Sequence, residues 1–231
     1  MANILLTGGS RGIGAAIADR LRDAHHLAVQ STGGDLPADF ADPAAPGYLW
    51  RRALDRLDGR IDILINNAGV FEANPIDVSD DDWVAGWERT LRINLTAAAE
   101  LSRLAVRHWQ EQGSAGRIIN IASRAAHRGD SPAHWHYAAA KGGMVAMTKT
   151  IARAYAKDRI LAFAICPGFT MTGMAGDYVA SRGGDKLLAD IPLGRVAMPD
   201  EVAVMAAFCA TEAPESMTGA VLDVNGASYV R

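Results

Sequence analysis

The stretch Thr7-Gly8-Gly9-Ser10-Arg11-Gly12-Ile13-Gly14 decides the fold of this chain. An apolar run, residues 2–7, leads into it, and a run rich in alanine, residues 15–21, follows it, so the predicted order is strand, glycine-rich turn, helix. Gly8 would let the chain turn sharply off the strand, Gly12 would let the backbone approach a pyrophosphate, and Gly14 would let the helix pack closely on the sheet. The free N–H groups at the start of the helix would then face the phosphates. This order predicts nucleotide binding, with a plain tight turn as the alternative.

Length and composition fit one well-packed domain, residues 1–231, with 49% hydrophobic residues. The 23 Lys and Arg residues against 26 Asp and Glu give a net charge of −3 without a basic tract, which argues against nucleic acid as a partner. Cys166 and Cys209 lie in apolar runs and predict buried free thiols. No apolar run approaches the roughly 18 residues of a membrane span, and the chain starts as a strand, so we expect a soluble cytoplasmic protein.

The second predicted strand, residues 27–32, should carry the group that reads the adenosine ribose. A reader of the 2′-hydroxyl would be an acid about 20 residues beyond the glycines. This strand ends without an acid, and Asp35 comes only after two further glycines. Arg11 could instead pair with a 2′-phosphate through charge-assisted hydrogen bonds. We therefore expect NADP(H) rather than NAD(H), with Ser31 as a further cofactor contact, and Asp35 keeps NAD(H) open.

The connection that follows is short. Residues 36–40 resemble a third strand, but residues 33–35 leave no room for a helix before it, whereas a parallel crossover normally needs about a dozen residues. Either a bare turn replaces the crossover helix, or this segment is not part of the main sheet. Asp42 could hydrogen-bond adenine or cap the helix predicted over residues 44–57.

The middle of the chain supplies polar groups at strand ends. A buried strand over residues 61–65 runs into Asn66-Asn67-Ala68-Gly69, and a strand over residues 117–123 ends at Ser123. The carboxyl ends of such strands line the ligand crevice of an open α/β sheet. Asn94 lies on an apolar face of a helix predicted over residues 91–112, so its amide needs partners, either backbone groups or a water in the site.

The run Tyr137-Ala138-Ala139-Ala140-Lys141 places a phenol and an ammonium at positions i and i+4 of one helix face. An ammonium beside a phenol favours the phenolate, so we expect the pKa of Tyr137 to fall toward the working pH. Such a tyrosine can exchange a proton with an alcohol or ketone oxygen. The alternative is a surface Tyr and Lys on an ordinary helix.

Together these motifs resemble the short-chain dehydrogenase/reductase family, and the likeness runs from residue 2 to the C-terminus. It rests on the glycine-rich turn of residues 7–14, Asn66 to Gly69, Asn94, Ser123, Tyr137 with Lys141, and Pro167-Gly168, which occur in one order with fitting spacing. The segments 191–195, 199–202 and 218–226 resemble the closing segments of the 3-oxoacyl-carrier-protein reductase-like group. The resemblance implies a single-domain α/β Rossmann fold, with a doubly wound parallel sheet of about six to seven strands and a shortened connection after the second.

The resemblance also implies an NAD(P)(H)-dependent oxidoreductase that transfers hydride between nicotinamide and a ketone or secondary alcohol. Tyr137 would be the general acid or base, and Ser123 would stabilise the developing charge on the carbonyl oxygen. Lys141 would bind the nicotinamide ribose and lower the pKa of Tyr137, and Asn94 would hold a water that relays protons to Lys141. The expected cofactor contacts are Gly8, Ser10, Arg11, Gly12, Ile13, Gly14, Ser31, Asp42, Asn67, Ala68, Gly69, Tyr137, Lys141, Pro167, Gly168, Thr170 and Thr172.

The substrate is less defined. A variable lid over about residues 171–190 would finish its pocket. Arg124 and Arg128 could favour an anionic substrate, although solvated surface charge is the preferred interpretation. His134 and His136 lack further ligands nearby, so we expect no metal.

Within the oxidoreductase class, a 3-oxoacyl thioester reductase competes with a sugar- or steroid-type alcohol dehydrogenase. A non-catalytic nucleotide-sensing protein is the alternative from another class, and the presence of all four proposed catalytic residues argues against it. The helices over residues 91–112 and 135–156 resemble the family's dimer-forming pair, so we expect a homotetramer, with a homodimer as the alternative. The expected partner is a small carbonyl or alcohol substrate, and neither nucleic acid nor a membrane is expected.

Overall fold

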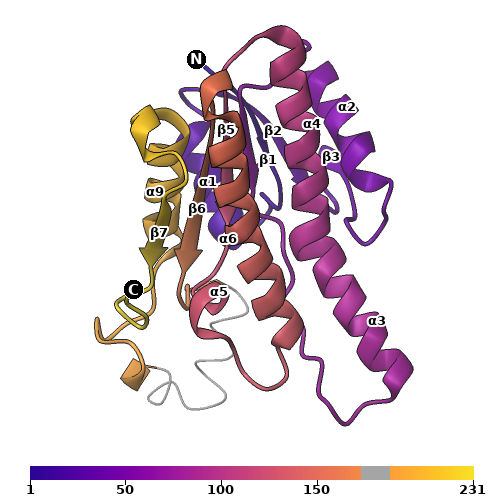
Figure 1. Ribbon diagram of the computed structural model, residues 1–231, viewed down its shortest axis with the longest axis vertical. Helices are drawn as coiled ribbons and strands as arrows, with labels where there is room; N and C mark the ends of the chain where they lie inside the picture. The colour runs from indigo at the N-terminus through magenta and orange to yellow at the C-terminus, as the bar shows by residue number, and fades with distance from the viewer. Residues whose placement is uncertain (173–187) are drawn as a thin grey trace.

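The computed structural model describes residues 1–172 and 188–231, and its centre is a parallel sheet (Figure 1). Within these residues the sheet has seven strands in the order β3-β2-β1-β4-β5-β6-β7, and every pairing is parallel. The order reverses between β1 and β4, which is where such sheets open a ligand crevice at the carboxyl ends of their strands. The predicted Rossmann architecture is confirmed. The strands are β1 (Asn3–Leu6), β2 (His26–Ser31), β3 (Leu36–Pro37), β4 (Ile63–Asn66), β5 (Gly116–Ile121), β6 (Ile160–Pro167) and β7 (Val221–Val224).

Helices cover both faces of the sheet, as a doubly wound fold requires. One face packs against α2 (Ala45–Arg56), α4 (Ala97–Gln112) and α6 (Trp135–Tyr155), and the other against α1 (Gly12–Leu21) and α9 (Pro199–Thr211). Figure 1 shows α4 and α6 in front of the strands, with the short α5 (Ala125–Arg128) near the arrowheads of β6 and β7. The 3₁₀ turns η2 (Ala156–Asp158) and η3 (Glu215–Met217) follow α6 and α9.

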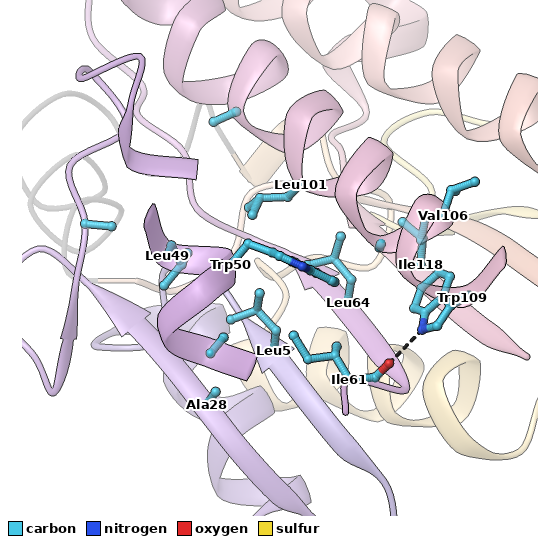
Figure 2. Close-up of a cluster of buried hydrophobic side chains, with 14 of the residues drawn as sticks. Leu5, Ala28, Leu49, Trp50, Ile61, Leu64, Leu101, Val106, Trp109 and Ile118 are labelled. Atoms are coloured by element: carbon cyan, nitrogen blue, oxygen red, sulfur yellow. Dashed lines mark hydrogen bonds between the residues drawn. The ribbon is translucent and has the colours of Figure 1, made fainter. Parts of the chain in front are cut away.

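Alternate strand residues enter the two cores. Leu5, Leu64 and Ile118 point toward α2 and α4 (Figure 2), whereas the residues on either side of each, such as Ile4 and Leu6, pack on the opposite face against α1 and α9. This alternation is the period of two that a strand imposes. Both faces are buried, so these strands read as continuous apolar runs.

Trp109 anchors α4 to the sheet (Figure 2). Its indole Nε1 donates a hydrogen bond to the carbonyl oxygen of Ile61 at 2.6 Å, and the side chain is 1% exposed. A methyl group at Gly116 would overlap the indole ring, so the glycine at the start of β5 makes room for it.

The short connection after β2 is a turn of residues 32–35, and β3 pairs with β2 in parallel. The register joins Gln30 to Leu36, so the bare-turn alternative is correct and β3 belongs to the main sheet. The strand is two residues long rather than the five expected. Gln30 stabilises this edge, because its side-chain Nε2 donates to the Ala38 carbonyl oxygen at 2.7 Å.

The helix expected over residues 91–112 is part of a longer one. Helix α3 (Asp80–Leu91) continues through the π-helical segment η1 (Arg92–Thr96) into α4. The expected start at Leu91 is wrong, since Leu91 is the last residue of α3. π-helical turns inside longer helices are frequent at functional sites, and this one contains Asn94.

Two further expectations are confirmed. Cys166 and Cys209 are free and buried, and α2 and α6 match their predicted ranges to within a residue at each end. Among the described residues, no helix combines the length and apolar character needed to cross a membrane.

Candidate active site

The glycine-rich turn has the backbone geometry that its sequence predicts. Gly8 and Gly12 adopt φ values of 68° and 54°, in the left-handed region that favours glycine. A methyl group at Gly14 would overlap the carbonyl oxygen of Gly8 and would lie 2.5 Å from Nδ2 of Asn67. Gly14 therefore permits close packing as predicted, and its neighbours are the turn itself and the end of β4.

Asn67 and Thr7 join this turn to the end of β4. The Asn67 side-chain amide donates to the carbonyl oxygens of Thr7 and Gly8 at 3.0 and 2.9 Å. The Thr7 hydroxyl accepts from the backbone N–H groups of Asn67 and Ala68 at 3.0 and 3.1 Å. The amide N–H groups of Asn67 therefore hold the turn in place, and its contact with the cofactor stays a prediction.

Gln30 is a supporting residue that sequence reasoning missed. Its Oε1 accepts from the Gly8 backbone N–H at 2.8 Å, while its Nε2 holds Ala38. A polar residue in an otherwise apolar strand was the available signal, since a buried amide requires partners. The residue thus links the glycine-rich turn to the edge strand β3.

The groups expected on the adenosine side are mostly open to solvent. Ser10 and Arg11 are exposed, and Arg11 forms no ion pair with any residue in the described ranges. Ile13 lies in the first turn of α1, and Ser31 is 9% exposed at the end of β2. The Asp42 carboxylate accepts from the Ala44 backbone N–H at 2.9 Å in the turn before α2, and the N-cap of α2, Ala44, has no side-chain hydrogen bond, so the structure does not support the capping alternative.

Asn94 is fully buried in the π-helical segment, where its side-chain amide forms hydrogen bonds with the backbone of Val70. Its Oδ1 accepts from the N–H of Val70 and its Nδ2 donates to the carbonyl oxygen of Val70, both at 2.8 Å. A methyl group at Gly69 would lie 3.1 Å from this Oδ1 and 3.6 Å from Nζ of Lys141. The Gly69 backbone therefore lies beside both side chains, and a larger residue at this position would crowd Asn94.

Ser123 and Tyr137 come together beyond the carboxyl end of β5. The Ser123 hydroxyl lies close enough to the Tyr137 phenol to lower its pKa, and the Ser123 Oγ accepts from the Ala125 backbone N–H at 3.1 Å. Ser123 is 9% exposed, and Tyr137 is half-buried. The ring of Phe71 meets the Tyr137 ring edge to face, with centroids 4.8 Å apart.

Lys141 lies one helical turn beyond Tyr137, as predicted. Its Nζ is 5.8 Å from the centroid of the Tyr137 ring and donates to the Ile121 carbonyl oxygen at 2.8 Å. The side chain is buried, and burial lowers the pKa of Lys141 to about 8. The alternative of a surface Tyr–Lys pair is therefore wrong.

The expected fall in the pKa of Tyr137 is also wrong for the protein alone. Burial raises the pKa of Tyr137 to about 12, and the nearby Ser123 hydroxyl opposes that rise without cancelling it. Removing water from a phenolate disfavours the charged form more than this hydroxyl favours it here. A spacing of i and i+4 does not reveal this burial.

The segment after β6 closes the crevice from the other side. Pro167 ends the strand, the N–H of Gly168 donates to the Val224 carbonyl oxygen at 2.9 Å, and the buried Thr170 bonds the Gly168 carbonyl oxygen at 3.2 Å. The Thr172 Cγ2 lies 2.9 Å from where a methyl group on Gly12 would be. The predicted nicotinamide and phosphate segments therefore meet. Of the expected lid, residues 173–187 lie outside the described residues.

The histidines near Tyr137 make local contacts. His134 hydrogen-bonds Ser131 at 2.7 Å and stacks on Phe71 with centroids 3.8 Å apart, and His136 Nδ1 accepts from the Tyr137 N–H at 2.9 Å.

A different cluster could hold a metal within the described part of the chain: His127, Cys166 and Asp223, whose ligand atoms lie within 4.8 Å of one another. Asp223 already pairs with Arg231 at 3.0 Å, and burial raises the pKa of the Cys166 thiol to about 11. The expected absence of a metal stays a prediction.

The preferred interpretation of Arg124 as a solvated charge is wrong. The residue is 9% exposed, and its guanidinium lies 4.7 Å from the centre of the Phe169 ring. Arg128 is exposed, as that interpretation expects, and hydrogen-bonds Asp190 at 2.7 Å. No sequence pattern places Phe169 and Asp190 beside Arg124, because both lie far along the chain.

Comparisons with known proteins agree with this geometry. A family model described as enoyl-(acyl carrier protein) reductase matches residues 9–227. The 3-oxoacyl-[acyl-carrier-protein] reductase FabG of Vibrio cholerae is 32% identical over 98% of this chain and 96% of its own length. The cis-4-hydroxycyclohexanecarboxylate dehydrogenase of Sinomonas cyclohexanicum is 32% identical over 96% of this chain and 94% of its own.

A solved structure extends the likeness to three dimensions. The crystal structure of a proposed gluconate dehydrogenase from Agrobacterium tumefaciens superimposes with a TM-score of 0.87 at 28% identity, covering 100% of this chain and 97% of the other. The matched region contains the glycine-rich turn from Gly9 onward, together with Ser123, Tyr137 and Lys141. The chain therefore belongs to the short-chain dehydrogenase/reductase family of oxidoreductases, and it is similar to that family's 3-oxoacyl-[acyl-carrier-protein] reductases.

Proposed function

We propose that this chain interconverts a ketone and a secondary alcohol with a nicotinamide cofactor, and that Tyr137 carries the proton. The observation that supports this most directly is the proximity of the Ser123 hydroxyl to the Tyr137 phenol, close enough to lower the pKa of Tyr137, at the carboxyl end of β5 with Lys141 nearby. A substrate oxygen that approaches both hydroxyls would find two donors. Family membership indicates the class of reaction, and the hydroxyls of Ser123 and Tyr137 are the groups that would contact the substrate oxygen.

The crevice has the features that a dinucleotide requires. Gly8 and Gly12 expose backbone in conformations that favour glycine, and the ammonium of Lys141 has no ion-pair partner among the described residues. We expect the glycine-rich turn to hold the pyrophosphate and Lys141 to hold the nicotinamide ribose. The bound nicotinamide would supply or accept the hydride.

In the reducing direction Tyr137 would donate its proton to the substrate oxygen. A pKa of about 12 keeps the phenol protonated at neutral pH, which is the form that donation requires. Ser123 would hold the same oxygen and stabilise its developing negative charge. A water held by Asn94 near Lys141 would return a proton toward Tyr137 through Lys141.

The test is Tyr137→Phe, with Tyr155→Phe near the end of the same helix as the matched control. The Tyr137 variant should still bind the cofactor, read by the fluorescence of reduced nicotinamide, and should lose turnover by a factor of about 10² to 10⁴. The control should keep both. Full activity in Tyr137→Phe would contradict the proposed mechanism. If the wild type binds the cofactor but turns over no compound in a broad panel of ketones, a nucleotide-sensing protein is favoured instead.

We propose NADP(H) as the preferred cofactor because Arg11 is exposed at the start of α1 and unpaired within the described ranges. Arg11→Ser should raise KM for NADPH about tenfold or more and leave KM for NADH nearly unchanged, since only NADPH carries the 2′-phosphate. Arg22→Ser is the control, because Arg22 lies at the other end of the helix and pairs with Asp19 at 2.6 Å. Equal effects of Arg11→Ser on both cofactors would contradict the preference.

Two substrate classes follow from the relatives: a 3-oxoacyl thioester, as the name of the Vibrio protein states, or a hydroxy acid, as the names of the other two state. A sugar- or steroid-type alcohol is the third candidate. We also propose assembly as a homotetramer, with a homodimer as the alternative, through the long helices α4 and α6. Light scattering at micromolar concentration tests the assembly. We also propose that the enzyme is cytoplasmic.

A further inference from the structure

An arginine is buried directly beside the proposed catalytic serine. Arg124 is 9% exposed, and its backbone N–H donates to the Pro167 carbonyl oxygen at 2.9 Å, which ties it to the end of β6. Its guanidinium lies over the Phe169 ring, 4.7 Å from the centroid. Arginine is rarely buried to this extent without a paired anion, because removing a charge from water is costly.

The one carboxylate that forms an ion pair with Arg124 among the described residues, Asp190, is shared with Arg128. Asp190 Oδ2 is 3.6 Å from Nη1 of Arg124 and 2.7 Å from Nη1 of Arg128. The shorter contact is a hydrogen bond to Arg128, whereas the Arg124 Nη1 has no hydrogen-bond partner in the described part of the chain. Asp130 adds a weaker attraction and forms no ion pair there with either arginine. Burial and the neighbouring Arg128 lower the pKa of Arg124, which is the expected signature of a guanidinium whose charge is under-compensated.

The position of Arg124 relates this charge to the reaction. It follows Ser123 in the chain, so the two Cα atoms are about 3.8 Å apart. The ring beneath its guanidinium belongs to Phe169, which follows the Pro167-Gly168 pair at the nicotinamide side. A group bound by Arg124 could therefore belong to the same small molecule as an oxygen held by Ser123 and Tyr137.

We propose that Arg124 binds a carboxylate of the substrate, so that the enzyme acts on a keto acid and the corresponding hydroxy acid. This inference rests on the proposed oxidoreductase function and specifies its substrate class. A guanidinium matches a carboxylate through paired N–H donors, and the stacked Phe169 ring holds the guanidinium in place for that contact. A carboxylate carries one negative charge, whereas a phosphate monoester carries nearly two and would meet more repulsion from Asp190.

The test compares each acid with a neutral analogue of the same shape. The substrates are 4-oxocyclohexanecarboxylate, acetoacetate and 5-ketogluconate, each beside its primary amide, together with acetoacetyl-CoA and the phosphate ester of 4-hydroxycyclohexanone. In the wild type, kcat/KM for at least one acid should exceed that of its amide by about 10- to 100-fold. Arg124→Gln should remove this preference and leave kcat/KM for the amide within a few-fold.

Three variants keep the test independent of folding. Arg124→Lys should retain part of the preference, and Asp190→Asn should increase it, since the competing carboxylate is removed. Arg153→Gln, at an exposed arginine on α6, is the control and should change nothing. Thermal unfolding with and without cyclohexanecarboxylate measures binding without turnover, and this acid should raise the midpoint in the wild type and not in Arg124→Gln.

The outcomes separate the two proposals. Reduction of amides or acetoacetyl-CoA without any preference for acids overturns the role of Arg124 and leaves the oxidoreductase function standing. Preference for the phosphate ester over every carboxylate also overturns the assignment. Thermal stabilisation by the acid that depends on Arg124, without turnover of any compound, supports the carboxylate site and removes the proposed function.

Discussion

Replacing Lys141 by methionine should stabilise the cofactor-free protein at neutral pH and inactivate it. Lys141 is 4% exposed, and its one hydrogen bond in the described chain goes to the Ile121 carbonyl oxygen. Burial lowers the pKa of Lys141 from 10.5 to about 8, and at 1.36 kcal/mol per pKa unit this corresponds to about 3 kcal/mol of destabilisation by the charged form. Methionine has a similar length and no charge, although the lost hydrogen bond costs about 1 to 2 kcal/mol.

The sign of the pH dependence follows from the lowered pKa. Below pH 8 the lysine is charged in both the folded and the unfolded protein, so the full destabilisation is present. Between pH 8 and 10.5 the folded protein releases the proton while the unfolded protein keeps it, so the stability of the wild type rises with pH. Lys141→Met should therefore be more stable than wild type by about 1 to 2 kcal/mol at pH 7, and this advantage should shrink by about 3 kcal/mol by pH 10.5.

Urea unfolding of the cofactor-free protein at both pH values, at one protein concentration, measures the difference in free energy of unfolding. Lys149→Met is the matched control, because Lys149 lies two turns along the same helix and is exposed. Its effect should be small and independent of pH. A Lys141→Met difference that does not change between pH 7 and pH 10.5 would refute the reasoning.

Two further predictions concern the glycine-rich turn and the α4 anchor. Gly14→Ala should lower the free energy of unfolding by about 1 to 3 kcal/mol and abolish cofactor binding, because the added methyl group overlaps the Gly8 carbonyl oxygen. The control is Gly33→Ala, which has open space around the added methyl group and should change neither property. Thermal unfolding and a cofactor titration measure the two properties, and normal cofactor binding by Gly14→Ala would contradict this prediction. Trp109→Phe should lower the free energy of unfolding by about 2 kcal/mol through the lost bond to Ile61 and the smaller ring, with kcat of the folded enzyme unchanged; urea unfolding that matches the wild type would contradict it.

The fold could be predicted because local signals agree with one another. The turn from Gly8 to Gly14 marks the first crossover, and continuous apolar strands indicate a sheet covered on both faces. The β2–β3 connection could be narrowed only to two alternatives, because its outcome depends on the Gln30 side chain reaching Ala38 across the sheet edge. The π-helical segment could not be foreseen, since its residues suit an ordinary helix equally well.

The sequence identifies which residues form the candidate site, but it does not predict their pKa values or their burial. Ser123, Tyr137 and Lys141 follow from strand ends and helical spacing, which are local properties. The raised pKa of Tyr137 and the burial of Arg124 depend on Phe169, Asp190 and the protein that surrounds them, which the chain brings in from distant positions.

The π-helical segment at Asn94 behaves like one extra residue inserted into a continuous helix, because its wider turn shifts the direction in which the side chains before and after it point. Each residue of an α-helix turns about 100° around the axis, so one residue accommodated within a widened turn changes the direction of everything on its far side by that angle. Deleting a single residue between Arg92 and Thr96 would restore an uninterrupted α-helix and rotate α3 relative to α4. Trp83 and Trp87, which now stack on each other and face Trp135 and His136 of α6, would swing away from that partner helix. A change of one codon in length could thus redirect an entire helix relative to the sheet.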